Sequence, residues 1–200
     1  GKTAVLLPSS QDHKRIFDGD KGPNTGGMGA YSPAPVVTDD MMPRIKDEIV
    51  MPVVRELATR GITYRGILYA GLMITPDTAQ KKPLSGSSIN VVEFNARFGD
   101  PETEAVLPRI EGDFSKALFN AATGNLSDDD IKVSSSAAAT VVLSSSGYPG
   151  DYAKDKLVSG LENVDEKSVV FHCGTRFGED GEVLTSGGRV FSVTGVGEDI

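Results

Sequence analysis

Glu93, Asn95 and Arg97 stand at alternate positions of the chain and could together bind a metal-bound nucleotide triphosphate. The segment 91–95 is predicted to be a β-strand, in which successive side chains point to opposite faces, so Glu93 and Asn95 share one face. A carboxylate and an amide oxygen are hard ligands that suit Mg²⁺, which completes its octahedron with water and phosphate oxygens. The planar guanidinium of Arg97 is suited to phosphate oxygens. The spacing therefore predicts a site for a metal and a phosphate chain.

The same residues also have ordinary structural explanations. Glu93 and Asn95 could be exposed polar positions on a half-buried strand. Arg97 could pair with Asp100 or Glu102 as a structural ion pair instead of contacting phosphate. The pattern alone leaves these alternatives open.

A second group of candidate ligand-binding residues lies in residues 11–35, which are predicted to form a long loop. A loop of this length without secondary structure of its own is usually functional or disordered. We expect its backbone N–H groups to face phosphate or carboxylate, although glycines serve ordinary turns equally well. A solvated charge cluster is the alternative for its cationic residues. The candidates are Lys14, Arg15, Asn24, Thr25, Gly26, Gly27 and Gly29.

Composition excludes several classes of protein. The net charge of −8 at pH 7 argues against a sequence-independent nucleic-acid binder, which needs a cationic surface. No apolar run is long enough to predict a membrane span. The single cysteine, Cys173, excludes an internal disulfide and favours a reducing compartment, here the cytoplasm. We expect its side chain to be buried and inert.

Periodicity and punctuation residues predict the helices. One helix should be kinked at Pro52 and end at Gly61. Asp100 is a candidate N-cap for the next helix. A further short helix is expected to run from Asp113 to Gly124.

The strand pattern divides the chain in two. A buried strand over 66–74 should pair antiparallel with 91–95, on which Val92 and Phe94 pack away from Glu93. Residues 126–136 change to a serine- and aspartate-rich composition. The segments beyond them read as strands at 137–143, 168–173, 182–184 and 189–194. We therefore predict an α+β fold with domains at 1–128 and 134–200, the second a small β-rich barrel or sandwich.

Several longer motifs resemble the phosphoribosylamine–glycine ligase family, also called glycinamide ribonucleotide synthetases, of the ATP-grasp superfamily. In the first domain these motifs are residues 11–15, 22–31 and 97–102. In the second they are residues 147–152, 171–175 and 187–190. The resemblance covers essentially all of the chain.

The resemblance implies a ligase that joins glycine to 5-phosphoribosylamine at the expense of ATP, through glycyl phosphate, in purine biosynthesis. It implies an ATP-grasp large lobe followed by the family's C-terminal domain. It places Mg²⁺ or Mn²⁺ on Glu93 and Asn95, and we expect Arg97 and Asp100 to act at the reacting centre.

The resemblance also implies missing parts. The family's Rossmann-like domain and small ATP-grasp lobe have no counterpart here, so we expect a segment of a longer polypeptide that is inactive alone. Both ends read as cut, and residues 4–8 resemble the second strand of a hairpin. Fusion to other purine-pathway enzymes is compatible with the family. The remaining alternatives are another ATP-grasp carboxylate–amine ligase and a non-catalytic phosphate-binding or assembly module.

Overall fold

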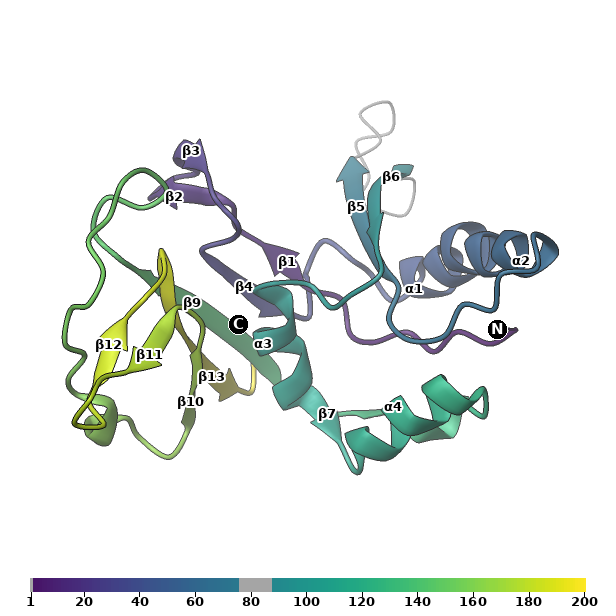
Figure 1. The fold of residues 1–200 in the computed structure, drawn as a ribbon. Coiled ribbons are helices and arrows are strands. Elements are labelled where there is room, and N and C mark those ends of the chain that lie inside the picture. Colours follow the sequence, from purple (N-terminus) through teal and green to yellow (C-terminus); the bar gives the residue numbers. More distant parts are fainter. Residues whose placement is uncertain (1, 76–87) are drawn as a thin grey trace. The chain divides into compact units, whose positions relative to one another are not determined.

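The computed structural model describes residues 2–75 and 88–200, which fold into two compact units (Figure 1). The first unit comprises Gly1–Ser9, Ala34–Gly99 and Ile110–Ser134, and the second Ser10–Pro33, Asp100–Arg109 and Ser135–Ile200. Each unit is assembled from separate stretches of sequence. The predicted domains 1–128 and 134–200 stay a prediction, because compactness groups the residues differently. Within the described residues no helix is long and apolar enough to cross a membrane.

The longest helical segment of the first unit is irregular near Pro52. It consists of α1 (Met41–Arg44), the π-helical η1 (Ile45–Val50) and α2 (Met51–Thr59). Because proline has no N–H to donate, a break in regular hydrogen bonding is expected close to it, and the π turns lie directly before α2. Gly61 adopts a φ of +75° just past the end of the helix, as the sequence predicted. The core of this unit forms around buried Met41, Ile45, Val50 and Val54.

The strands β5 (Tyr69–Thr75) and β6 (Ser88–Asn95) form an antiparallel ribbon, as predicted. Figure 1 shows them as a pair of adjacent arrows. The register of the pair shifts, because Gly71 lies opposite Glu93 whereas the next residue, Leu72, lies opposite Val91. The strict alternation of side chains expected between positions 91 and 93 is therefore broken. Val92 and Phe94 were expected to pack on one face, but they are 64% and 38% exposed.

The last part of the first unit contains one helix, which is capped at both ends, and several short elements. It is α4 (Phe114–Thr123), accompanied by β7 (Ile110–Glu111), η3 (Asp128–Asp130) and β8 (Lys132–Val133). The Asp113 carboxylate accepts the N–H of Lys116 at 2.9 Å, and Gly124 is left-handed with a φ of +87°, so both predicted ends are confirmed. The strand predicted at residues 4–8 is wrong, because residues 2–10 form no strand. Instead, Ala4 and Leu6 pack against the helical core.

The second unit is built on one open antiparallel sheet in the order β1-β4-β9-β13-β10. Its strands are β1 (Gln11–Asp12), β4 (Gly29–Ser32), β9 (Ala137–Ser144), β13 (Arg189–Gly197) and β10 (Ser168–His172). The β-rich character of the C-terminal part is confirmed, but the strands that the structure describes close no barrel. The sequence analysis missed that residues 11–32 supply two of the strands.

Shorter elements surround this sheet. They are the hairpin β2 (Arg15–Phe17) and β3 (Lys21–Asn24), the pair β11 (Thr175–Phe177) and β12 (Val183–Thr185), α3 (Glu102–Val106), η2 (Leu107–Arg109) and η4 (Leu161–Asn163). The loop predicted at 11–35 therefore contains four short strands. α3 packs on the sheet, where Ala105 is fully buried and the Thr194 hydroxyl donates to the carbonyl of Glu104 at 3.0 Å.

Two further expectations are wrong. Asp100 does not cap α3, because Pro101 occupies the N-cap position without a side-chain cap bond and the Asp100 carboxylate bonds to Arg189 instead. Cys173 is exposed, although it was expected to be buried, because it lies just beyond the end of β10 at the sheet's edge.

Candidate functional site

The predicted metal ligands Glu93 and Asn95 lie at the end of β6. Glu93 is paired with Gly71 of β5, and Asn95 is paired with Tyr69. A Cβ atom on Gly71 would stand 3.0 Å from Cγ of Glu93, so the glycine leaves space for the glutamate side chain. The alternation of the strand holds at these two positions, and both side chains leave the ribbon on the predicted common face.

The donor set of β6 fits a hard divalent cation. Glu93 is exposed and offers a carboxylate, while the side-chain nitrogen of Asn95 is buried and has no hydrogen-bond partner among the described residues. A buried polar atom without a partner calls for an explanation, and rotation of the amide would put its oxygen there instead. No group of three His, Cys, Asp or Glu side chains in residues 2–75 and 88–200 could hold a metal. A cation here would therefore take further oxygens from water and phosphate.

Arg97 follows β6 and is exposed. Its guanidinium donates one hydrogen bond, to the carbonyl of Phe98 at 2.6 Å. The alternative partner considered from the sequence, Asp100, is held on both carboxylate oxygens by Arg189. The other N–H groups of Arg97 have no assigned bond in the described structure, which is compatible with a phosphate ligand.

The glycine-rich segment of the second unit uses its own backbone N–H groups. Thr25 donates to the carbonyl of Lys14 at 2.7 Å and Gly26 to the hydroxyl of Tyr148 at 3.2 Å. Gly27 donates to the hydroxyl of Thr25 at 3.0 Å. A phosphate or carboxylate bound by these amides would have to displace internal acceptors, so their role as ligands stays a prediction.

The remaining candidates of the second unit lie just before β2 and on β2, β3 and β4. Lys14 forms an ion pair with Asp12 at 2.5 Å, and Arg15 donates to the carbonyl of Gly22. Asn24 is exposed at the end of β3. Gly29 is buried in β4, where a Cβ would come within 2.6 Å of the carbonyl of Thr140, which gives this glycine a packing role.

Gly27 lies at a crowded junction. Its φ is +123°, and a Cβ there would be 2.3 Å from Cδ of Pro101 and 2.9 Å from Oδ1 of Asp12. That oxygen of Asp12 is buried without a hydrogen-bond partner among the described residues, while the other oxygen pairs with Lys14. Only glycine fits this position.

Arg189 is the residue that the sequence analysis left out. Its guanidinium holds Asp100 with two bonds of 2.8 and 2.7 Å and also donates to the carbonyls of Gly26 and Gly27 at 3.2 and 3.4 Å. The motif at 187–190 supported the family resemblance, but nothing in the local sequence says which carboxylate the arginine meets.

Comparisons with known proteins place the chain in a family. The family model for the phosphoribosylglycinamide synthetase ATP-grasp (A) domain matches residues 1–103, and that for the phosphoribosylglycinamide synthetase C domain matches residues 138–200. The chain belongs to the phosphoribosylglycinamide synthetase family. The family prediction made from the sequence motifs is thus confirmed.

Relatives with curated names agree with the family models. The phosphoribosylamine–glycine ligase of Yersinia pestis is 44% identical over 201 residues, covering 100% of this chain and 45% of that protein. The ligase of Vigna unguiculata is 42% identical over 203 residues and is covered to 63%. The chain thus spans about half to two thirds of the length of these relatives.

Solved structures support the fold. The phosphoribosylamine–glycine ligase of Thermotoga maritima superposes with a TM-score of 0.83 at 33% identity, covering 100% of this chain and 46% of that one. The biotin carboxylase domain of the Hydrogenobacter thermophilus 2-oxoglutarate carboxylase, solved with MgADP, ADP and bicarbonate, gives a TM-score of 0.56 at 11% identity. It covers 86% of this chain and 35% of that one. The α+β fold with part of an ATP-grasp lobe is therefore confirmed.

In this family member, Glu104 of α3 is a carboxylate in an unfavourable setting. Burial raises its pKa above the ordinary 4.5, and the nearby carboxylates of Asp100 and Glu102 act in the same direction, whereas its own backbone N–H and Arg189 oppose them. One of its oxygens is buried and has no hydrogen-bond partner in the described structure.

We expect Glu104→Gln to stabilise the chain at pH 7 but not at pH 4. A folded-state pKa above the unfolded one favours folding below the unfolded pKa and loses that contribution as the pH rises through the folded pKa. Urea unfolding at several pH values measures this, and the gap between mutant and wild type should widen with pH. Glu111→Gln, at an exposed position of β7, is the control and should show no such widening. An equal gap at all pH values would contradict the prediction.

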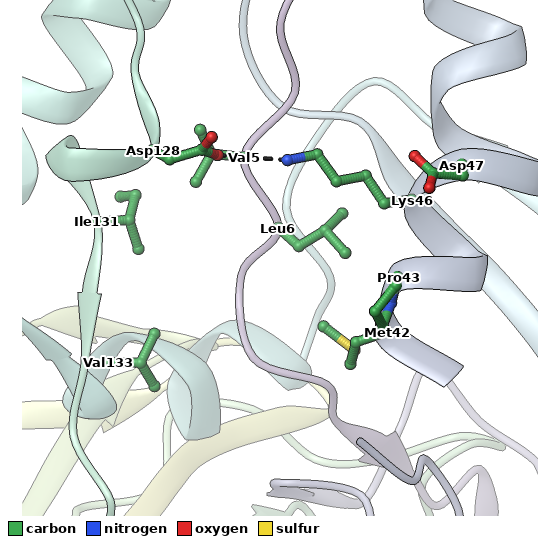
Figure 2. A pocket seen from close by; sticks show the side chains of 9 residues that line it. All are labelled: Val5, Leu6, Met42, Pro43, Lys46, Asp47, Asp128, Ile131 and Val133. Atoms are coloured by element: carbon green, nitrogen blue, oxygen red, sulfur yellow. Dashed lines mark hydrogen bonds and ion pairs between the residues drawn. The ribbon is translucent and has the colours of Figure 1, made fainter. Parts of the chain in front are cut away.

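A separate hollow of about 410 Å³ lies in the first unit (Figure 2). Lys46 and Asp128, which both line it, form an ion pair of 3.3 Å, and Figure 2 shows the apolar side chains of Leu6, Ile131 and Val133 below this pair. The residues that line it are Val5, Leu6, Met42, Pro43, Lys46, Asp47, Asp128, Ile131 and Val133. None of the predicted site residues lies among them.

Proposed function

We propose that this chain is the ATP-grasp and C-terminal portion of a phosphoribosylamine–glycine ligase. The complete enzyme would join glycine to 5-phosphoribosylamine and give glycinamide ribonucleotide, ADP and phosphate. The observation that carries the proposal is the 44% identity to the Yersinia pestis ligase across the whole chain. The oxygen ligands at the end of β6 are consistent with it.

In the proposed reaction a carboxylate oxygen of glycine attacks the γ-phosphorus of ATP, and ADP leaves. The amine of phosphoribosylamine then attacks the carbonyl carbon of glycyl phosphate, phosphate leaves and the nitrogen loses a proton. Such chemistry depends mainly on positioning and on neutralising charge. Arg97 would bind phosphate oxygens, and Asp100 would help to keep the neighbouring segments in place.

Glu93 and Asn95 would hold a divalent cation, which when bound neutralises charge on the nucleotide phosphates. A carboxylate and an amide oxygen with phosphate and water make an all-oxygen set, which suits either Mg²⁺ or Mn²⁺. The single cysteine is consistent with a reducing compartment such as the cytoplasm. Fusion of the complete polypeptide to other purine-pathway enzymes remains part of the proposal.

Phosphate release with ATP, glycine and phosphoribosylamine tests the function. We expect the complete polypeptide to turn over only when all three substrates are present, and the 200-residue chain to show no turnover. The parts of the relatives that this chain does not cover would supply the rest of the nucleotide clamp. A complete polypeptide that uses another amine or acid, or none, would favour a different ATP-grasp ligase or a non-catalytic module.

A further inference from the structure

We propose that Arg189 is a positioning residue that fixes the glycine-rich segment and Asp100 as one rigid junction. The inference rests on the proposed function, because it assumes that these segments border the reacting groups.

The guanidinium connects three segments that are distant in sequence. Arg189 begins β13 and reaches both oxygens of Asp100 at 2.8 and 2.7 Å, which is the bidentate geometry of a strong arginine–carboxylate pair. The same side chain donates to the carbonyls of Gly26 and Gly27 at 3.2 and 3.4 Å. The Arg189 side chain is 21% exposed and that of Asp100 is 55% exposed, so the arginine end of the pair is largely covered while the carboxylate end faces solvent.

The neighbouring residues complete the junction. A Cβ on Gly188 would stand 2.2 Å from Cδ2 of Tyr148, so the tyrosine ring lies directly against this glycine. The hydroxyl of that tyrosine accepts the N–H of Gly26. A Cβ on Gly26 would come within 3.0 to 3.3 Å of the Arg189 guanidinium, so a methyl group there would require the guanidinium to shift by a few tenths of an ångström. Tyr148 therefore holds Gly26 through its N–H, and Arg189 holds it through its carbonyl.

The junction needs the shape of arginine and not only its charge. A lysine ammonium could reach one oxygen of Asp100, but it lacks the planar fork in which one nitrogen donates to Oδ2 of Asp100 and the other donates to Oδ1 and to the two carbonyls. Both oxygens of Asp100 are occupied by this fork. Asp100 therefore acts here as the anionic partner of Arg189.

Arg189→Lys in the complete polypeptide tests the proposal. We expect kcat to fall by about 10²-fold with little change in KM for ATP, because misplacement of a site by roughly 1 Å costs about that factor. Arg176→Lys is the matched control, since Arg176 also holds a carboxylate of the same unit, Asp155, with bonds of 3.0 and 2.9 Å. It should leave kcat unchanged. Thermal unfolding of both variants separates a local effect from lost folding.

Hydrogen exchange at the amides of Gly26 and Gly27 in the 200-residue chain gives a second readout. Arg189→Lys should speed exchange at both, and Arg176→Lys at neither. Wild-type kinetics together with unchanged exchange in Arg189→Lys would overturn the proposal. If the complete wild-type polypeptide makes no glycinamide ribonucleotide, the proposed function is wrong. The exchange result would still decide whether Arg189 fixes the glycine-rich segment.

Discussion

Glu93→Gln combined with Asn95→Ala is expected to lower kcat of the complete polypeptide by at least about 10²-fold and to weaken its dependence on divalent metal. Removing one electrostatic partner of a transition state typically costs about 10²- to 10³-fold. The two side chains are neighbours on the same face of β6, so their effects should not add independently. Steady-state rates over a range of Mg²⁺ concentrations measure both changes.

Asn90→Ala provides a matched control for this pair. Asn90 is also an amide on β6, and its nitrogen donates to the hydroxyl of Ser88 at 3.2 Å, away from the strand end. It should leave the metal dependence unchanged. If the double variant kept the metal dependence of the wild type, the assignment of the ligands to β6 would be wrong.

Gly27→Ala is expected to destabilise the 200-residue chain by about 3 kcal/mol, through backbone strain at positive φ and overpacking. The added methyl would meet Pro101 at 2.3 Å and the unpartnered oxygen of Asp12 at 2.9 Å, and Pro101 directly follows Asp100, which Arg189 holds. Urea unfolding followed by circular dichroism measures the loss.

Gly195→Ala is the control for Gly27→Ala in the same unit. Gly195 lies in β13, where a Cβ would meet nothing within 4 Å. The change should alter the free energy of unfolding by no more than roughly 0.5 kcal/mol. Equal destabilisation by the two substitutions would show that the Gly27 junction is not the constraint that the contacts indicate.

The elements that the sequence predicted well are those determined by local chemistry. Asp113 and Gly124 mark the ends of α4 because an N-cap carboxylate and a left-handed glycine act within one turn of the helix. β6 was recognisable because its β-branched and polar residues are contiguous. The role assigned to Glu93 and Asn95 depended on this strand.

The features that the sequence did not predict depend on distant partners. The pairing of Arg189 with Asp100 joins residues 89 positions apart. The short strand β1 pairs with β4, and β4 pairs with β9, which comes more than a hundred residues later in the sequence. The register shift in β6 likewise follows from its pairing with β5 and carries no signal of its own in the sequence.

The most direct test is the position of the metal in crystals of the complete polypeptide grown with ADP and Mn²⁺, located by anomalous scattering. The account predicts a peak within coordination distance of a carboxylate oxygen of Glu93 and the amide oxygen of Asn95, next to the nucleotide phosphates. A peak bound elsewhere, with both side chains turned away from it, would contradict the account.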